Sequence, residues 1–152
     1  MITIAFATET GSAESLAEEA AEKLSGFGLV NRIVDLGDMD ISQLEGTETL
    51  IAVVSTWGDG EPPGGVEGFF GDLQEARDLR LSLTSFAVLA LGDSSYDLFC
   101  QFGKDLDSEL AKRGARRILP RVDCDIDYEE PFEQWINNLV YALKSRREVA
   151  GV

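Results

Sequence analysis

Short apolar runs alternate with amphipathic helical patterns along this chain, and no other feature restricts its fold as strongly. Residues 50–54 form the clearest run, and such continuous apolar character is typical of strands covered on both faces. The predicted strands are Ile2 to Ala7, Leu29 to Leu36, Thr49 to Ser55, Phe86 to Leu91, and Ala115 to Val122, the last of them broken by Pro120.

Helical patterns, with apolar residues three or four positions apart, lie between these strands. The predicted helices are Ser12 to Leu24, Gly65 to Ala76, Cys100 to Arg113, and Glu130 to Ser145, followed by a frayed tail from Arg146 to Val152. Strands that alternate with helices predict parallel βαβ units. We therefore expect an open, doubly wound α/β sheet of five strands. A ligand of such a sheet binds beyond the carboxyl ends of the strands.

Composition narrows the possible functions. The 152 residues fit a single domain, which we expect to span 1–152. The net charge of −15 argues against nucleic acid or an anionic membrane as partner. The chain has no histidine, which excludes Ser-His-Asp and Cys-His catalysis and histidine-ligated zinc. We expect no catalytic residue and no metal site.

The two cysteines, Cys100 and Cys124, are too few for a disulfide framework and form no CxxC pair. They indicate a reduced, cytoplasmic protein. The N-terminus has no basic segment of the kind that opens a signal peptide, and no apolar run approaches the roughly 20 residues of a membrane span.

The loop from Thr8 to Ala13 joins the first predicted strand to a helix. It is small and rich in hydroxyl groups, and a helix start offers free backbone N–H groups to an anion. Because the loop has no Lys or Arg, it suits a phosphate monoester better than a triphosphate. The alternative interpretation is an ordinary helix with Ser12 as its N-cap.

The loop after the third predicted strand carries Trp57 next to Gly58. An exposed tryptophan beside glycine is costly unless it covers something, and a flat ring ligand would stack on it. Alternatively, the indole folds back onto the core of its own domain.

The loop after the fourth predicted strand places a second aromatic, Tyr96, at the same edge of the sheet. Two aromatics from neighbouring loops can enclose one flat ring while the first loop holds a phosphate. Such a ligand is flavin mononucleotide (FMN) or a similar molecule.

These loops resemble those of the flavodoxin superfamily, and they are most similar to the FMN domains of diflavin reductases of the sulfite reductase flavoprotein and cytochrome P450 reductase type. Residues 55–63 read STWGDGEPP and resemble the family motif STYGDGEP, and residues 91–100 read LGDSSYDLFC and resemble LGDSSYxxFC. Residues 121–125, together with Tyr128 and Trp135, are similar to the end of the sulfite reductase FMN domain. The resemblance implies a flavodoxin-like three-layer α/β/α sandwich of short-chain type, with a five-stranded parallel sheet in the order 2-1-3-4-5.

The same resemblance implies FMN as the cofactor. By this resemblance, Trp57 and Tyr96 would flank the flavin ring, and residues 8–13 would bind the FMN phosphate. Glu9 departs from the family, and we expect it to face solvent because a carboxylate beside a phosphate is unfavourable. The implied FMN-binding residues are Thr8, Glu9, Thr10, Gly11, Ser12, Ala13, Ser55, Thr56, Trp57, Gly58, Asp59, Leu91, Gly92, Asp93, Tyr96, Phe99 and Cys100.

The function implied is electron transfer by a flavodoxin without a substrate site of its own. Electrons would pass from an NADPH-dependent flavoprotein reductase to a metalloenzyme or another reductase, and the acidic surface suits basic partners. The start at Met1 and the lack of a trailing linker favour a free, monomeric carrier over the FMN module of a diflavin reductase. A third hypothesis is a flavodoxin-like binding module that has lost its flavin.

Overall fold

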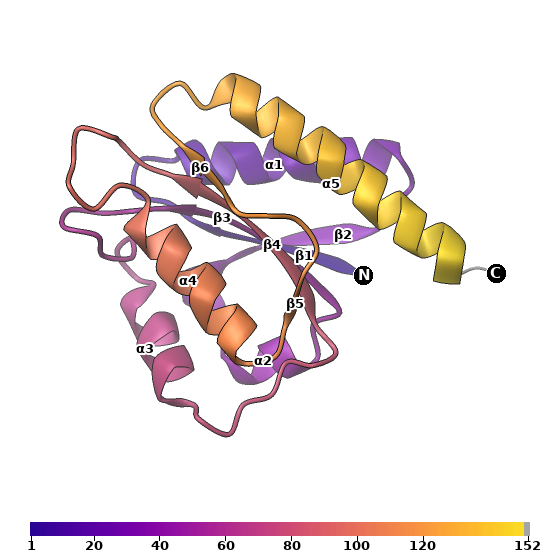
Figure 1. Cartoon of the computed structure of the whole chain (residues 1–152), viewed down its shortest axis with the longest axis horizontal. Coiled ribbons are helices and arrows are strands. Elements are labelled where there is room, and N and C mark those ends of the chain that lie inside the picture. Colours follow the sequence, from indigo (N-terminus) through magenta and orange to yellow (C-terminus); the bar gives the residue numbers. More distant parts are fainter. Residues whose placement is uncertain (151–152) are drawn as a thin grey trace.

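A parallel sheet organises the molecule (Figure 1). The computed structural model describes residues 1–150, with side chains as far as residue 146. The strand order is β2-β1-β3-β4-β5, with β6 also paired to β4, which confirms the predicted order. The strands are β1 (Ile2–Ala7), β2 (Asn31–Asp35), β3 (Thr49–Ser55), β4 (Ser85–Leu91), β5 (Arg116–Arg117) and β6 (Val122–Cys124).

The last predicted strand consists of two short pieces, β5 and β6. Both pair in parallel with β4, first with Arg116 opposite Ser85 and then with Val122 opposite Leu89. Pro120 lies between the pieces and has no N–H to donate to a ladder, which explains the break. After it the pairing resumes with the register shifted by two residues, and β6 still leads the following residues to the carboxyl edge of the sheet.

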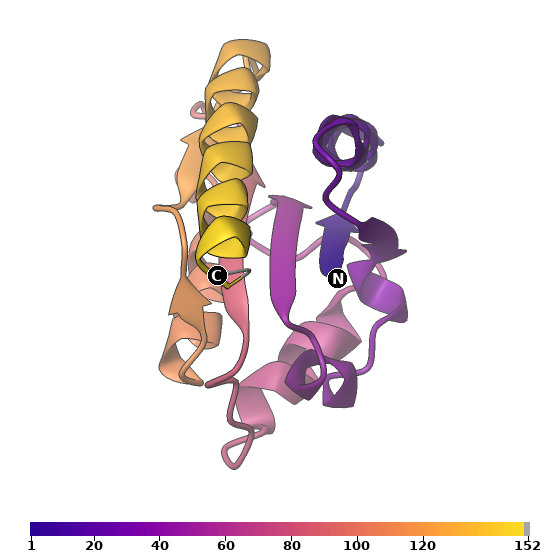
Figure 2. The ribbon, with the colours of Figure 1, turned by 90° about the vertical axis from the view of Figure 1, so that its right-hand side faces the viewer.

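Helices cover both faces of the sheet. On one face lie α1 (Ser12–Gly26) and α5 (Glu129–Ala150), and on the other lie α3 (Glu67–Glu75) and α4 (Gln101–Lys112) (Figures 1 and 2). The short helix α2 (Ser42–Glu45) and a 3₁₀ turn at Leu36–Asp38, which the sequence pattern does not reveal, connect β2 to β3. None of the described helices combines the length and apolar character needed to cross a membrane.

Successive side chains of a strand pack into two separate hydrophobic cores, one on each face of the sheet. In β3, Ile51 and Val53 pack with the apolar side of α1 and α5, while Ala52 and Val54 pack with α3 and α4. Alternate side chains of a strand point to opposite faces, so covering both faces requires an unbroken apolar run. This confirms the three-layer arrangement expected from the sequence.

Several element boundaries differ from the prediction by one or two residues, and the C-terminal end of α5 differs by more. The strand expected to reach Leu36 ends at Asp35, whose carboxylate accepts the Gly37 N–H at 2.8 Å and caps the 3₁₀ turn. Helix α5 runs past the expected end at Ser145 as far as Ala150, so residues 146–150 of the expected tail are helical. Residues 151–152 lie outside the described part of the chain.

Candidate functional site

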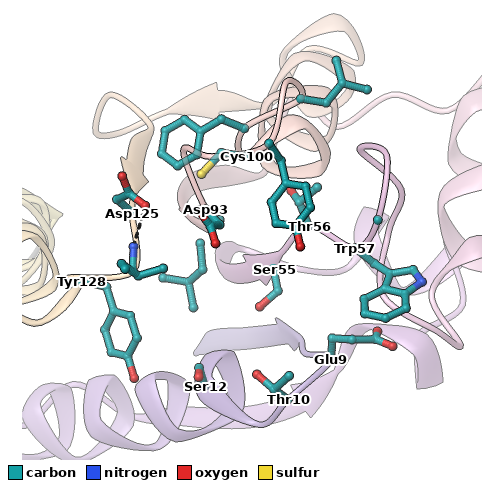
Figure 3. A pocket seen from close by; sticks show the side chains of 17 residues that line it. Glu9, Thr10, Ser12, Ser55, Thr56, Trp57, Asp93, Cys100, Asp125 and Tyr128 are labelled. Atoms are coloured by element: carbon teal, nitrogen blue, oxygen red, sulfur yellow. Dashed lines mark hydrogen bonds between the residues drawn. The ribbon is translucent and has the colours of Figure 1, made fainter.

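A pocket of about 450 Å³ opens where the parallel strands end (Figure 3). That volume falls within the range of small-molecule sites, roughly 300–1,000 Å³. Four loops contribute to it. The first loop (residues 8–11) follows β1, the second (residues 56–66) follows β3, the third (residues 92–100) follows β4, and the fourth (residues 125–128) follows β6.

The first loop leaves the start of α1 without a side-chain cap. Gly11, with a φ of 96°, is the N-cap, and no side chain there bonds to the first backbone N–H groups. Ser12 is the first helical residue and not the cap of the alternative interpretation. Thr8 Oγ1 accepts the Gly11 N–H at 2.9 Å and so holds the loop in shape. A helix start of this kind, with Thr10 and Ser12 at the pocket wall, can bind an anion.

The second loop turns tightly around Trp57. The Trp57 carbonyl accepts the N–H groups of Gly60 and Glu61, and the Trp57 N–H donates to the Glu61 carbonyl at 2.8 Å. Gly58 and Gly60 both have positive φ, 50° and 96°, which the turn requires. The indole lines the pocket and is 51% exposed, so it does not fold into the core.

The third loop brings Tyr96 to the pocket, where it is 60% exposed. Gly92 allows the start of this loop to pack closely against Cys100, since a Cβ at this position would lie 2.9 Å from Cys100 Sγ. In Figure 3, Trp57 and Tyr128 lie at opposite ends of the pocket, with Ser55 and Asp93 between them. Exposed aromatic faces around an open pocket are suited to a flat ring ligand.

Three carboxylates line the pocket, and each holds a loop in place. Asp93 Oδ1 accepts the N–H and the hydroxyl of Ser95 at 2.9 and 2.7 Å. Glu9 is exposed, as expected, and its carboxylate accepts the Gly64 N–H at 3.0 Å, which ties the first loop to the second. Asp125 accepts from Ser94 in the third loop. The pocket is therefore acidic around a backbone anion site.

Both cysteines are buried as thiols. Burial raises the pKa of Cys100 to about 12 and that of Cys124 to about 11. The Cys100 thiol lies 3.6 Å from the carbonyl oxygens of Ala90 and Cys124. A helix start can favour a thiolate, but desolvation dominates here and leaves Cys100 a structural residue at the pocket wall.

Most of the sequence-predicted residues line this pocket, but Thr8, Gly11, Ala13 and Asp59 do not. Asp59 is exposed near the tip of the second loop, and Ala13 is buried on the side of α1 that faces the core. The predicted residues in the lining are Glu9, Thr10, Ser12, Ser55, Thr56, Trp57, Gly58, Leu91, Gly92, Asp93, Tyr96, Phe99 and Cys100.

Sequence reasoning did not assign Leu98 or the fourth loop to the site. Asp125, Ile126 and Tyr128 line the pocket because β6 ends at the same edge as the other strands. Ligands of such sheets bind beyond the carboxyl ends of the strands, so the end of the last predicted strand is the sequence signal for this loop.

A flavodoxin family profile matches residues 4–135. The chain belongs to the flavodoxin family. The flavoprotein alpha-component of the NADPH sulfite reductase of Bacillus subtilis strain 168 is 41% identical over 150 residues, which cover 99% of this chain and 24% of that protein. The corresponding component of Escherichia coli K12 is 43% identical over 150 residues, which cover 99% of this chain and 25% of that protein. This flavodoxin domain thus spans about a quarter of these relatives.

Solved flavodoxins have the same fold and similar lengths. The flavodoxin of Streptococcus pneumoniae TIGR4 is 29% identical, with a TM-score of 0.83, and the match covers 95% of this chain and 98% of that one. A cysteine-to-alanine variant of the Pseudomonas aeruginosa flavodoxin is 26% identical, with a TM-score of 0.79 and coverage of 94% and 98%.

FMN is the cofactor of this family, and the pocket residues fit it. The uncapped start of α1 offers backbone donors to a phosphate monoester, and Trp57 and Tyr96 offer exposed rings to a flat heterocycle. The first loop has no Lys or Arg to neutralise a more highly charged group such as a triphosphate.

Proposed function

We propose that this flavodoxin domain, residues 1–152, binds FMN in the pocket and transfers electrons between redox proteins. One observation carries the proposal: an uncapped helix start and two exposed aromatics, from three separate loops, line a single pocket. Bound FMN accepts and donates electrons one or two at a time, and so links hydride donors to one-electron acceptors.

The chain itself holds and shields the cofactor in this proposal. The backbone of residues 8–13 binds the phosphate, with the hydroxyls of Thr10 and Ser12 as further donors. Trp57 and Tyr96 cover the flavin ring and exclude water from it. Their exposed edges leave a route for electrons to a redox partner protein. The remaining contacts come from Ser55, Thr56, Gly58, Asp59, Leu91, Gly92, Asp93, Phe99 and Cys100.

Two forms of this function each have a supporting observation. A free carrier is supported by the structural likeness to a solved flavodoxin, with a TM-score of 0.83. The FMN module of a diflavin reductase is supported by the higher identity to the sulfite reductase flavoproteins, 41–43%. We retain the free, monomeric, cytoplasmic carrier as the first candidate. It would accept electrons from an NADPH-dependent flavoprotein reductase and pass them to a metalloenzyme or another reductase.

Titration with two flavins tests cofactor binding. FMN and riboflavin share the ring, but riboflavin has no phosphate. Quenching of flavin fluorescence should give a much lower Kd for FMN, because only FMN uses the donors at the start of α1. Ser12→Ala should weaken FMN about tenfold and leave riboflavin unchanged. Equal affinity for both flavins, or binding of neither, would contradict the proposal.

A reconstituted electron-transfer assay separates the two forms. The FMN-loaded chain is mixed with a separately purified NADPH-dependent flavoprotein reductase, and reduction of cytochrome c, a basic one-electron acceptor, is followed. A free carrier should support the reaction as a separate protein, at a rate that falls with added salt because the acidic surface attracts a basic partner. Activity only after covalent fusion to the reductase would favour the module.

A further inference from the structure

The pairing of β4 with β6 continues beyond the two strands. The ladder ends with Leu91 opposite Cys124, and the Gly92 N–H then donates to the Cys124 carbonyl at 2.9 Å. Two residues further along the third loop, the Ser94 N–H donates to the carboxylate of Asp125 at 3.0 Å instead of to a backbone carbonyl. A side chain therefore joins the third and fourth loops where the strands have stopped.

Asp125 receives three hydrogen bonds at this junction. Its Oδ1 accepts the N–H groups of Ser94 and Ile126, the latter at 2.8 Å, and its Oδ2 accepts the Ser94 hydroxyl. The bonds from Ser94 lower the pKa of Asp125, so the group is ionised at neutral pH. Hydrogen bonds to an ionised acceptor are stronger than those between neutral groups.

The fourth loop is held at both ends. Asp125 holds one end, and the Phe132 N–H, which donates to the Tyr128 carbonyl at 2.9 Å, fixes the other to the start of α5. Ile126, which follows Asp125, and Tyr128, which carries the second attachment, both line the pocket. Figure 3 shows the Tyr128 side chain at one end of it. On the other side of the junction, the third loop carries Tyr96 to the same pocket. The Asp125–Ser94 contact thus joins these two walls directly.

We propose that Asp125 is a positioning residue: by holding Ser94 it sets the spacing between the third and fourth loops, and with it the fit of the pocket around a flat ring. The inference rests on the proposed FMN function. Asp125 need not touch the flavin to act in this way. Its effect reaches the ring through Tyr96 on one wall and through Ile126 and Tyr128 on the other.

The test compares Asp125→Ala with Asp127→Ala. Asp127 is a matched control, because it lies two residues away in the same loop, carries the same charge and does not line the pocket. The Kd for FMN comes from fluorescence quenching, and the visible circular dichroism of FMN at saturation reports the surroundings of the ring. Urea unfolding of the flavin-free chains checks their stability separately.

Asp125→Ala should weaken FMN about tenfold and alter the visible dichroism, whereas Asp127→Ala should change the Kd less than about twofold. Ser94→Ala removes one of the three bonds and should fall between them. In the Ser94→Ala background, Asp125→Ala should have a smaller effect than in the unaltered chain, because the two residues share one contact.

The outcomes separate this inference from the proposed function. If the unaltered chain does not bind FMN, the proposed function fails and the inference fails with it. If the unaltered chain binds FMN and Asp125→Ala matches Asp127→Ala in Kd and dichroism, only the inference is overturned. If Asp125→Ala does not fold, Ser94→Ala decides: an unchanged Kd and an unchanged dichroism would overturn the inference.

Discussion

At the scale of single residues, hydrogen bonding to a neighbouring loop explains how the pocket tolerates carboxylates. Glu9 lies in the proposed phosphate loop, yet its carboxylate accepts the Gly64 N–H at 3.0 Å and remains exposed. Its charge still lies at the pocket wall. Glu9 therefore couples two loops at some electrostatic cost to an anionic ligand.

Glu9→Gln should tighten FMN binding, because the amide oxygen can still accept the Gly64 N–H while the negative charge is lost. We expect about a two- to fivefold lower Kd at low salt, corresponding to roughly 0.3–1 kcal/mol. The gain should shrink in added salt. Glu19→Gln, an exposed change on α1, is the control. Fluorescence titration at low salt and with added salt measures the effect. Weaker FMN binding by the Glu9→Gln variant would refute the prediction.

The buried thiols give a second prediction at this scale. Because the pKa of Cys100 is raised to about 12 and that of Cys124 to about 11, both thiols stay protonated at pH 8. Ellman's reagent should react slowly with the folded chain and rapidly in urea. A rate typical of free cysteine in the folded chain would contradict the assignment.

The same shifts predict a dependence of stability on pH. An acid whose pKa is higher in the folded state favours folding while it is protonated. The contribution of Cys100 is present below about pH 9 and is lost as the pH rises toward about 12. The free energy of unfolding should fall over this window, and Cys100→Ala should reduce the fall. Urea titrations at several pH values measure both.

At the scale of elements, close packing of α4 on the sheet holds the third loop at the site. A Cβ on Gly103 would lie 2.3 Å from the Cβ of Ala90 in β4, so the helix backbone presses directly on the strand. Nearby, the Phe102 N–H donates to Thr56 Oγ1 at 3.0 Å, which joins the start of α4 to the second loop. The position of α4 thus fixes two loops of the pocket.

Gly103→Ala should destabilise the chain by about 1–3 kcal/mol, because the added methyl pushes α4 away from β4. Gly71→Ala in α3 is the matched control. Its Cβ would meet nothing within 4 Å, so it should stabilise the chain by roughly 0.5–1 kcal/mol through helix propensity. Urea unfolding measures both, and equal effects of the two variants would disprove the packing argument.

At the scale of the whole molecule, charge is the dominant property. A net charge of −15 on 152 residues opposes the compact state through self-repulsion while favouring association with basic partners. The same charge therefore lowers stability and serves the proposed electron transfer.

Added salt should raise the Tm of the flavin-free chain, because screening weakens this repulsion. If screening contributes about 1 kcal/mol, the Tm should rise by roughly 2–4 °C between low salt and about 0.2 M sodium chloride. Thermal unfolding followed by circular dichroism measures it. Sucrose at equal osmolality is the control, and a Tm that falls with salt would be inconsistent with net repulsion.

The fold class, the strand order and three of the four site loops could be predicted from the amino-acid sequence. Continuous apolar runs and helical spacing are local patterns, and parallel strands bring the loops after them to one edge. The strand order followed from the motifs in those loops, which resemble the flavodoxin family. Trp57 and Tyr96 could be assigned because they follow two neighbouring strands.

The rest of the site depends on contacts that exist only in the folded chain. Gly11, and not Ser12, occupies the N-cap position of α1, the Glu9 carboxylate accepts the Gly64 N–H, and the Asp125 carboxylate accepts the Ser94 N–H. The last two contacts join residues far apart in the sequence, and the cap depends on the path of the whole first loop. Local propensity does not encode such contacts, because they form only once packing of the two cores has set the distances between loops.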